Sequence, residues 1–396
     1  MAYVNFKEEN YKLKIQLNKR KKNNDNIYSY IIKHKDDMTD YNANERYSYK
    51  EIKEETIGKK GDLDEKDFYI IQNIDILWSV FNNCIFSNVK FINCRIIGCK
   101  FNNCKFNAGG VIFENCIFIM ENKVQSPSLN KEANYSCEFY SCEFYCDFRN
   151  CDLSYAIFEK CLIRNTWYQN TMMKSTILNF CELNMVKICD CDLSGFKTHS
   201  CYIIDFEFDD KYKTKLDEKT FFDKLVEIKK DRDEEEGLYE TYQLIADKFK
   251  ENTLDNNFGE YYYLGKKMES KSLSLFPKIS NFLYRISCGY GERPFNALFL
   301  GIFLIMIFAL IYLFVGVDIN SKFVIYNWSK LSNFDFIKFI EDYNQTFALS
   351  TGVFLGVGGY DCEPVRLSLF ISAVEMVLGI ITVGIGLGAI VRKIIR

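Results

Sequence analysis

Large apolar residues recur at every fifth position through much of the first half of this chain. One run stays in register from Ile71 to Val111, and a later run ends at Phe208 after slipping by one residue at Phe148. A helix keeps one face with a period near 3.6 and a strand with a period of 2, so neither can hold these positions on one side. A period of five fits a coil in which each block of five forms one of four sides. The spacing predicts such a coil over residues 67–210, about six turns high at about 4.8 Å per turn.

Cysteine or alanine precedes many of these positions by two residues, in blocks such as CIFSN, CRIIG, CKFNN, CEFYS and CDLSY. These blocks resemble the pentapeptide-repeat family, although Cys often stands where Ala is more usual in that family. The resemblance implies a right-handed four-sided β-helix, in which side chains twenty residues apart stack. Phe86 is then expected to stack on Phe106. Each turn buries its apolar side chains only against its neighbours, as in other solenoids.

The sixteen cysteines are expected to be small buried residues rather than disulfide partners or metal ligands. The N-terminal residues MAYVNFKEENYKLK contain no apolar segment of a signal peptide, which favours a reducing compartment. Spacings of five and ten, no C-x-x-C pair and only two histidines, His34 and His199, argue against a zinc or iron–sulfur site. We therefore expect no metal and no cofactor.

The charge balance gives no argument for nucleic acid as a partner. The formal net charge of the chain is −3, and residues 68–208 carry 14 acidic against 12 basic side chains. Several pentapeptide-repeat proteins are thought to imitate DNA and block topoisomerases, which requires a strongly negative surface. The nearly neutral coil is therefore interpreted as a scaffold or sensor domain.

The zones on either side of the coil differ from it in composition. Residues 1–66 form a polar N-terminal segment, with short alternating stretches that favour an edge strand or a small cap. The run NKRKKNND within them is interpreted as a solvated turn. Residues 211–287 carry apolar residues at mixed spacings of three and four, which predicts a connector of amphipathic helices.

Two long apolar segments near the C-terminus predict membrane-spanning helices. Residues 295–317 carry no charge and residues 367–391 carry only Glu375, and each segment exceeds the about 20 residues that cross a bilayer. A buried core helix is the alternative. Basic residues precede the first segment and follow the second, and the loop between them is acidic. The positive-inside rule then predicts a multi-pass protein of the cell membrane with both termini cytoplasmic. The basic residues are Arg285, Arg293, Arg392, Lys393 and Arg396.

The stretch CGYGERPF contains Gly289-Tyr290-Gly291, a triplet that potassium channels carry in their selectivity filter. This stretch precedes the first span, on the predicted cytoplasmic side, so it cannot line an outer filter. It is interpreted as an interfacial turn, with Arg293 among the lipid headgroups and Tyr290 as an aromatic anchor.

Between the spans, EDYNQTFALSTGVFLGVGGYDCEP resembles the pore loop of the two-helix potassium-channel module. The resemblance covers roughly residues 285–396 and implies an all-α pore domain over residues 288–396, with a re-entrant loop at 340–364. It makes Phe347–Phe354, including Thr351, the end of a pore helix, and it makes Gly379 a hinge in the second span. The implied selectivity filter is Gly356, Val357, Gly358, Gly359 and Tyr360, followed by Asp361 and Glu363 at the outer mouth and by Pro364.

A filter of this kind replaces the water shell of an ion with rings of backbone carbonyls, and glycines tolerate the dihedral angles that this needs. Four subunits close such a ring, so the resemblance implies a homotetramer that conducts monovalent cations, potassium first. This chain departs from the family where Gly-Tyr-Gly becomes Gly358-Gly359-Tyr360 and where Gly356 replaces the innermost threonine. The departures leave potassium selectivity open, while cation conduction is still expected.

The second predicted span carries four further residues that need an explanation. Glu375 is costly in lipid and is expected to face protein or water, either packed behind the filter or lining the pore. Gly384, Gly386 and Gly388 are expected at close contacts between helices.

The leading hypothesis is a tetrameric cation channel with a cytoplasmic pentapeptide-repeat domain that acts as scaffold or sensor. The alternative is a membrane-anchored scaffold whose spans do not conduct. The sequence shows no Ser–His or Cys–His grouping, phosphate-binding loop or metal cluster, so we expect no enzymatic activity. The lipid bilayer is an expected partner in either case.

Overall fold

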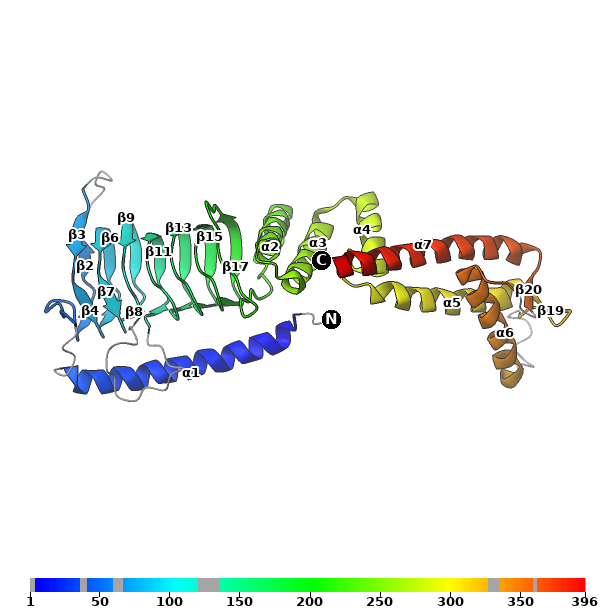
Figure 1. Ribbon diagram of the computed structural model, residues 1–396, viewed down its shortest axis with the longest axis horizontal. Helices are drawn as coiled ribbons and strands as arrows, with labels where there is room; N and C mark the ends of the chain where they lie inside the picture. The colour runs from blue at the N-terminus through cyan, green and yellow to red at the C-terminus, as the bar shows by residue number, and fades with distance from the viewer. Residues whose placement is uncertain are drawn as a thin grey trace. The chain divides into compact units, whose positions relative to one another are not determined.

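Two compact units, Met1–Ser272 and Leu273–Arg396, make up the chain. The first unit holds a stack of parallel strands, and the second is mostly helical (Figure 1). The computed structural model describes residues 4–35, 41–59, 67–119, 136–326, 335–358 and 362–395.

Parallel sheets form the sides of a β-solenoid with about six turns, as the five-residue period predicts. One sheet runs in the order β1 (Glu51–Lys53), β5 (Val80–Asn82), β8 (Lys100–Asn102), β10 (Glu138–Tyr140), β12 (Ile157–Glu159), β14 (Ile177–Asn179) and β16 (Lys197–His199). A second runs in the order β17 (Tyr202–Phe208), β15 (Glu182–Cys189), β13 (Leu162–Gln169), β11 (Glu143–Arg149), β9 (Lys105–Glu114), β6 (Ile85–Ile92) and β2 (Thr56–Gly58). Strand β3 (Tyr69–Gln72) also pairs with β6, and β4 (Asp75–Leu77) pairs with β7 (Arg95–Ile97).

Asparagines turn the chain at several corners of the solenoid. Asn73, Asn83, Asn93 and Asn103 have φ between 51° and 54°, in the left-handed region. Asparagine adopts this conformation more readily than most residues, because its short polar side chain bonds locally. Stacked asparagines also bond to each other, since Asn93 Nδ2 donates to Asn73 Oδ1 at 3.3 Å.

Stacked rings and thiols fill the interior of the solenoid. The Phe86 and Phe106 ring centroids lie 4.3 Å apart and nearly parallel, and Phe106 continues the stack onto Phe144 at 4.9 Å. The contact of Phe86 with Phe106 confirms the predicted twenty-residue stacking, and the longer step to Phe144 spans the break in the repeats. All sixteen cysteines are free and buried. Most thiols of the solenoid donate to backbone carbonyls of the neighbouring turn, as Cys104 Sγ does to Phe81 O at 3.4 Å. Cys288 and Cys362 belong to the second unit.

The register differs from the prediction in β9. The residue that stacks on Phe91 is Phe113, with ring centroids 4.9 Å apart, and not Val111, which pairs with Val89. The step from Phe106 to Phe113 is seven residues rather than five, so the strand shifts register between these two positions. Val111 is buried, as predicted, but its predicted place in the five-residue register is wrong for this reason.

Two other irregularities in the apolar series have a clear structural basis. The slip predicted at Phe148 is confirmed, because the β11–β13 ladder shifts register between Phe144 and Asp147. Thr198, which interrupts the series, is buried, and its hydroxyl accepts a hydrogen bond from the Asp223 N–H at 2.9 Å. The polar side chain is thus satisfied inside the solenoid.

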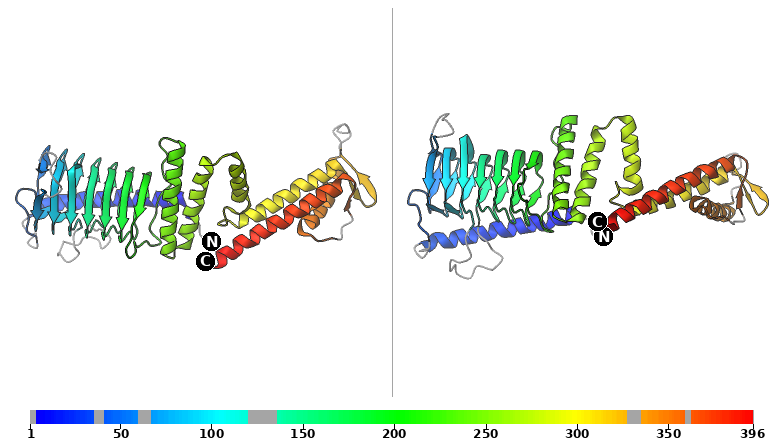
Figure 2. Two further views of the ribbon diagram at one scale, coloured as in Figure 1. Left: turned by 90° about the horizontal axis from the view of Figure 1, so that it is seen from above. Right: turned by 45° about the horizontal axis from the view of Figure 1, so that its top comes forward.

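Helix α1 (Phe6–Lys33) lies along the solenoid (Figures 1 and 2), where a strand or a small cap was expected. Its buried residues repeat at spacings of three, four and seven, which marks one face of a helix. They are Phe6, Leu13, Leu17, Arg20, Asn24, Ile27 and Ile31.

The run NKRKKNND forms the middle of α1 and is partly buried. Arg20 Nη1 donates to Tyr155 O at 3.0 Å and to Ser175 O at 2.8 Å. Asn24 Nδ2 donates to Glu138 Oε1 at 2.6 Å. The prediction of a solvated turn is therefore wrong, because two polar residues of the run face the solenoid and bond to it.

Helices α2 (Arg232–Glu251) and α3 (Asp255–Ser272) cover the C-terminal end of the solenoid, and α2 packs on β17. The hydroxyl of Tyr261 on α3 accepts from the Phe222 N–H at 2.9 Å and donates to Phe222 O at 2.7 Å. These two bonds satisfy the backbone N–H and C=O of Phe222, which would otherwise lie unpaired at an open edge of the solenoid. The amphipathic helices expected in 211–287 therefore include a cap for the solenoid.

The described residues of the second unit form four helices and a small antiparallel sheet. The helices are α4 (Leu275–Cys288), α5 (Phe295–Val315), α6 (Phe336–Leu355) and α7 (Leu367–Ile395). The sheet has the order β19 (Lys322–Val324), β18 (Val317–Ile319) and β20 (Cys362–Pro364). Because the unit begins at Leu273, α4 belongs with the apolar helices rather than with the cap.

Candidate functional site

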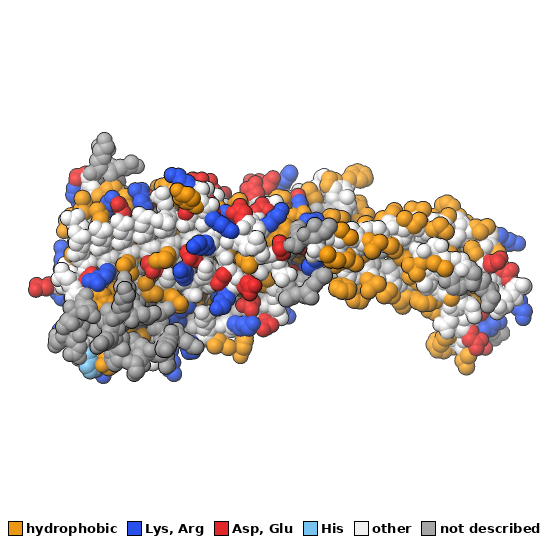
Figure 3. Space-filling model, in the orientation of Figure 1, with side chains coloured by type: hydrophobic (Ala, Val, Ile, Leu, Met, Phe, Trp, Pro, Cys, Tyr) orange, Lys and Arg blue, Asp and Glu red, His pale blue; other side chains and the backbone are white. Residues whose placement is uncertain are grey.

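Helices α5 and α7 carry apolar side chains on their outer surfaces. Figure 3 shows these side chains gathered over the second unit, and they include Phe299 at 67% exposure and Phe370 at 69%. Both helices are long and apolar enough to cross a membrane. A core helix of a water-soluble protein would have most of this surface covered, so the exposure argues against the buried-helix alternative.

The stretch CGYGERPF forms the turn between α4 and α5. Gly289, Tyr290 and Gly291 have φ of 55°, 59° and 84°, and the Arg293 N–H donates to Cys288 O at 3.0 Å. The predicted turn is thus present. The predicted lipid-facing anchor is not, because Tyr290 is only 2% exposed. Its hydroxyl bonds to the Asn281 side chain of α4 instead.

The end of α7 holds this turn in place. Lys393 Nζ donates to the backbone oxygen of Glu292 at 3.1 Å, and Arg392 lies 3.7 Å from the Glu292 carboxylate. The beginning of α5 and the end of α7 therefore lie at the same end of an antiparallel helix pair.

Helix α6 lies between α5 and α7 in the sequence, and it packs against both of them. Asp335 caps its N-terminus by accepting from the Ile337 and Lys338 N–H groups. The hydroxyl of Ser350 lies within hydrogen-bond distance of Ile305 O on α5 and of the Glu375 carboxylate on α7. Glu375 is fully buried, which agrees with a packing role for this residue.

The C-terminal end of α6 rests on α7 at Gly379. A Cβ atom at Gly379 would come within 2.1 Å of the Phe354 carbonyl oxygen, so only glycine allows this approach. The Phe354 ring in turn lies over Gly301 of α5, at 3.5 Å from the position of a Cβ there. Gly379 therefore allows α6 to pack closely on α7, and its role as a hinge stays a prediction.

The predicted filter begins where α6 ends. Gly356 has φ of 71° and caps the helix, with its N–H donating to Val353 O at 3.2 Å. Val357 is 58% exposed, and nothing lies within 4 Å of a Cβ at Gly358. Gly359, Tyr360 and Asp361 of the prediction lie outside the described residues. Within one copy of the chain, the described part of the filter faces open space.

The segment after the predicted filter pairs with the strand that follows α5. Glu363 on β20 stands opposite Asp318 on β18 in the antiparallel register, which brings two carboxylates together near the predicted outer mouth. Pro364 lies at the end of β20, opposite Val317. Thr351 donates its hydroxyl to Phe347 O within α6, at 2.8 Å.

Sequence reasoning missed Ser350 and Tyr312 as partners of Glu375. The Tyr312 hydroxyl donates to Glu375 Oε2 at 2.5 Å, and Tyr312 and Ser350 are fully buried. The sequence contained a signal for this pairing, because Tyr312 and Ser350 carry hydroxyl groups in otherwise apolar helices. A buried carboxylate needs such donors.

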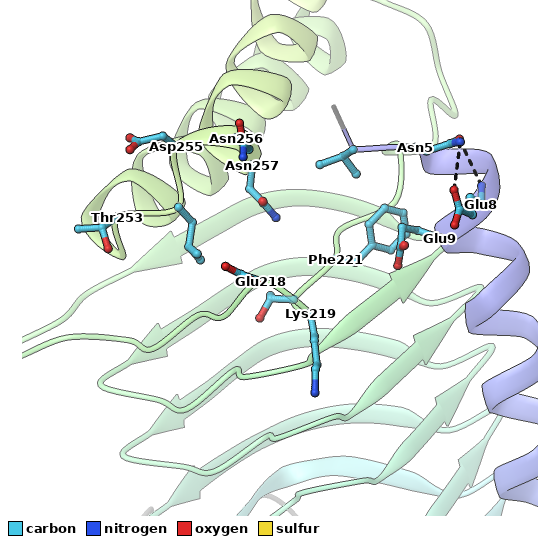
Figure 4. A pocket seen from close by; sticks show the side chains of 13 residues that line it. Asn5, Glu8, Glu9, Glu218, Lys219, Phe221, Thr253, Asp255, Asn256 and Asn257 are labelled. Carbon is cyan, nitrogen blue, oxygen red and sulfur yellow. Dashed lines mark hydrogen bonds between the residues drawn. The ribbon is translucent and has the colours of Figure 1, made fainter. Parts of the chain in front are cut away.

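A separate pocket of about 500 Å³ lies in the first unit, between the N-terminus of α1, residues 218–221 and the start of α3 (Figure 4). Its walls carry four carboxylates and one lysine. Asn5 caps α1 there by accepting from the Glu8 N–H at 3.3 Å. Among the described residues no group of three or more His, Cys, Asp or Glu side chains is arranged to hold a metal ion.

Comparison with known proteins bears on the first unit. Residues 81–119 match the family model of pentapeptide repeats (9 copies). No curated protein matches the chain.

Three solved structures with likeness to this chain are pentapeptide-repeat or fluoroquinolone-resistance proteins. Full-length QnrB1, a plasmid-mediated fluoroquinolone resistance protein, is 19% identical with a TM-score of 0.17 over 43% of this chain and 92% of that one. A trypsin-treated form of QnrB1 is 16% identical with a TM-score of 0.16 over 40% and 65%. HetL from the cyanobacterium Nostoc sp. strain PCC 7120, involved in heterocyst differentiation regulation, is 9% identical with a TM-score of 0.16 over 45% and 89%.

The stacked register of the solenoid and the family match agree with each other. The N-terminal half of this chain carries pentapeptide repeats folded as a β-solenoid.

Proposed function

We propose that this chain is the subunit of a tetrameric cation channel, in which α5 and α7 span the membrane and the segment after α6 lines the pore. The observation that carries the proposal is the close contact of α6 with Gly379 on α7, because the glycine-rich segment that starts at Gly356 directly follows α6. Glycines at this place allow backbone carbonyls to point toward an ion, and four copies would close the ring. Carboxylates at Glu363 and Asp318 would raise the local concentration of cations.

The pentapeptide-repeat solenoid serves in this proposal as a non-catalytic cytoplasmic scaffold. Its interior consists of stacked rings and buried thiols. The reducing cytosol would keep these free thiols reduced.

Ion flux through the full-length protein in lipid vesicles tests the proposal. Purified protein should release trapped potassium or sodium, and Gly358→Asp should abolish the release, because it places a side chain and a charge in the predicted filter. Asn320→Asp is the matched control, since it adds one negative charge in the β18–β19 turn at an exposed position whose φ of 50° an aspartate tolerates.

Native mass spectrometry of the detergent-solubilised protein should show four copies. No flux in any salt from a protein that inserts correctly would reject the channel and leave the membrane-anchored scaffold. A monomer would reject it as well, because one copy cannot close a ring.

A further inference from the structure

Helix α4 turns its apolar side away from the rest of its unit. The residues on this side are exposed by between 39% (Ile286) and 87% (Phe276). Their spacing is that of one face of a helix. We call them the α4 apolar face: Leu275, Phe276, Ile279, Phe282, Leu283 and Ile286.

The part of α4 that packs inward lies toward its C-terminal end and is polar or small, since Ser287 and Cys288 are buried and Asn281 is half-buried. Cys288 is 1% exposed, and the Asn281 side chain bonds to the Tyr290 hydroxyl of the following turn. A helix on the surface of a water-soluble domain has the reverse arrangement, with its apolar stripe inside. An apolar medium is therefore needed to cover the α4 apolar face.

The direction of α4 indicates which medium this is. Figures 1 and 2 show α4 running across the direction of α5 and α7, at the end where α5 begins. If α5 and α7 cross a bilayer, α4 then lies in the plane of its surface. Apolar residues at the start of α5 are exposed as well, with Phe295 at 57% and Phe299 at 67%.

The charges around α4 fit a negatively charged lipid surface. Its only charged residues are Lys278 and Arg285, which lie seven positions apart on one edge of the apolar face. Arg392 and Lys393 add two cations at the same end of the unit, and Glu292, whose carboxylate lies 3.7 Å from Arg392, is only 4% exposed. Apolar side chains bordered by basic ones are typical of helices that lie in the membrane interface and meet anionic headgroups.

We propose that α4 is an in-plane membrane anchor. Its apolar face lies at the boundary between headgroups and acyl chains, and Lys278 and Arg285 reach the phosphates of anionic lipids. The proposal rests on the membrane placement of α5 and α7, but it does not depend on conduction.

Spin labels on the full-length protein in bilayer vesicles test the anchor. Single cysteines are introduced as Ile279→Cys on the apolar face, Ser280→Cys beside it and Phe303→Cys on the exposed side of α5; the native thiols are all buried and stay unlabelled. Vesicles contain phosphatidylcholine with or without phosphatidylglycerol. The readout is the accessibility of each label to oxygen, which enters lipid, relative to a water-soluble nickel chelate.

The label at Ile279 should have an oxygen-to-nickel ratio several-fold above that at Ser280, and approaching that at Phe303. Adding phosphatidylglycerol should raise the ratio at Ile279 further, and no change would overturn the headgroup contact. Equal ratios at Ile279 and Ser280 with a lipid-exposed Phe303 would overturn the anchor and leave the spans intact. Protection of Ile279 from both reagents would also overturn it, because a protein surface would then cover α4. A water-accessible Phe303 would reject the membrane placement itself.

Discussion

The Tyr312 hydroxyl on α5 donates a hydrogen bond to the Glu375 carboxylate on α7 at 2.5 Å, with both side chains fully buried. Ser350 on α6 reaches the other oxygen of the same carboxylate. One acidic side chain therefore connects the three helices that surround the start of the predicted pore loop. A buried carboxylate with two hydroxyl partners fixes the relative positions of these helices more specifically than apolar contacts do.

Removing this carboxylate should destabilise the second unit. Glu375→Ala leaves the Tyr312 hydroxyl without its acceptor, and an unsatisfied buried group costs about 1–3 kcal/mol. Glu375→Gln should cost less than half as much, because its amide still accepts from Tyr312 and reaches Ser350. Thermal unfolding of the detergent-solubilised protein measures the difference. Val374→Ala, at a 38% exposed neighbour, is the control, and an equal effect of Glu375→Ala and Val374→Ala would contradict the prediction.

The close contact of α6 with Gly379 gives a second prediction. Gly379→Ala places a methyl group 2.1 Å from the Phe354 carbonyl oxygen, so α6 must move away from α7. Overpacking of this kind costs about 1–3 kcal/mol, and ion flux in vesicles should fall at least tenfold because the pore loop follows α6. Gly384→Ala is the matched control on the same helix, since nothing lies within 4 Å of a Cβ there. Equal flux and equal melting temperature for the two variants would show that α6 does not rest on Gly379.

The contact of α1 with the solenoid can be tested at Arg20. Burial lowers the pKa of Arg20 to about 10, so the group is still charged at neutral pH and both of its backbone bonds are charge-assisted. Arg20→Met keeps the apolar stem but loses these bonds, which should lower the free energy of unfolding by about 1–3 kcal/mol. Urea unfolding measures this loss, and limited proteolysis should cut faster between α1 and β1. Lys22→Met, at an exposed position of the same helix, should leave both measurements unchanged.

His199 should make the stability of the solenoid depend on pH. Burial lowers the pKa of His199 below its usual 6.5, and its Nδ1 lies 2.8 Å from Asn179 Oδ1. The unfolded chain then binds a proton at a higher pH than the folded chain does. The stabilisation from the neutral ring is complete above pH 6.5 and is lost as the pH falls toward the folded pKa.

Urea unfolding at pH 7.5 and pH 5.5 checks this dependence. His199→Gln should reduce the difference in unfolding free energy between the two pH values. His34→Gln changes the other histidine, which is exposed, and should keep the wild-type difference. A His199→Gln protein with an unchanged pH dependence would rule out this role.

The solenoid was predictable because its pattern repeats in every turn. Phe86 stacks on Phe106 and Phe106 on Phe144, each in the next turn, so a short sequence period encodes contacts between residues far apart in the chain. Insertions break this relation: two extra residues before Phe113 moved the stack off the predicted position, and only the partner strand reveals the new register.

Helix α1 was not predictable from hydrophobicity alone. Arg20 and Asn24 occupy two positions of its inward stripe, so the apolar pattern has a gap where the solenoid supplies carbonyls and a carboxylate instead. The candidate pore site was predictable only in part. Its helix and its spans follow from composition, but the bonding of Glu375 depends on which helices meet, and a single sequence does not contain that information.

The order in which the ribosome makes these parts has a consequence for folding. Asn10 on α1 bonds to Asp223, which is made 213 residues later, and Arg20 bonds to a carbonyl that appears 155 residues after it. The N-terminal half of the helix therefore lacks these partners until nearly the whole first unit has left the exit tunnel, whereas Ile27 and Ile31 pack on turns that are made early. A chain stopped partway through synthesis would expose the apolar residues of this amphipathic segment to chaperones. Complete docking of α1 would then be a late step in the folding of the first unit.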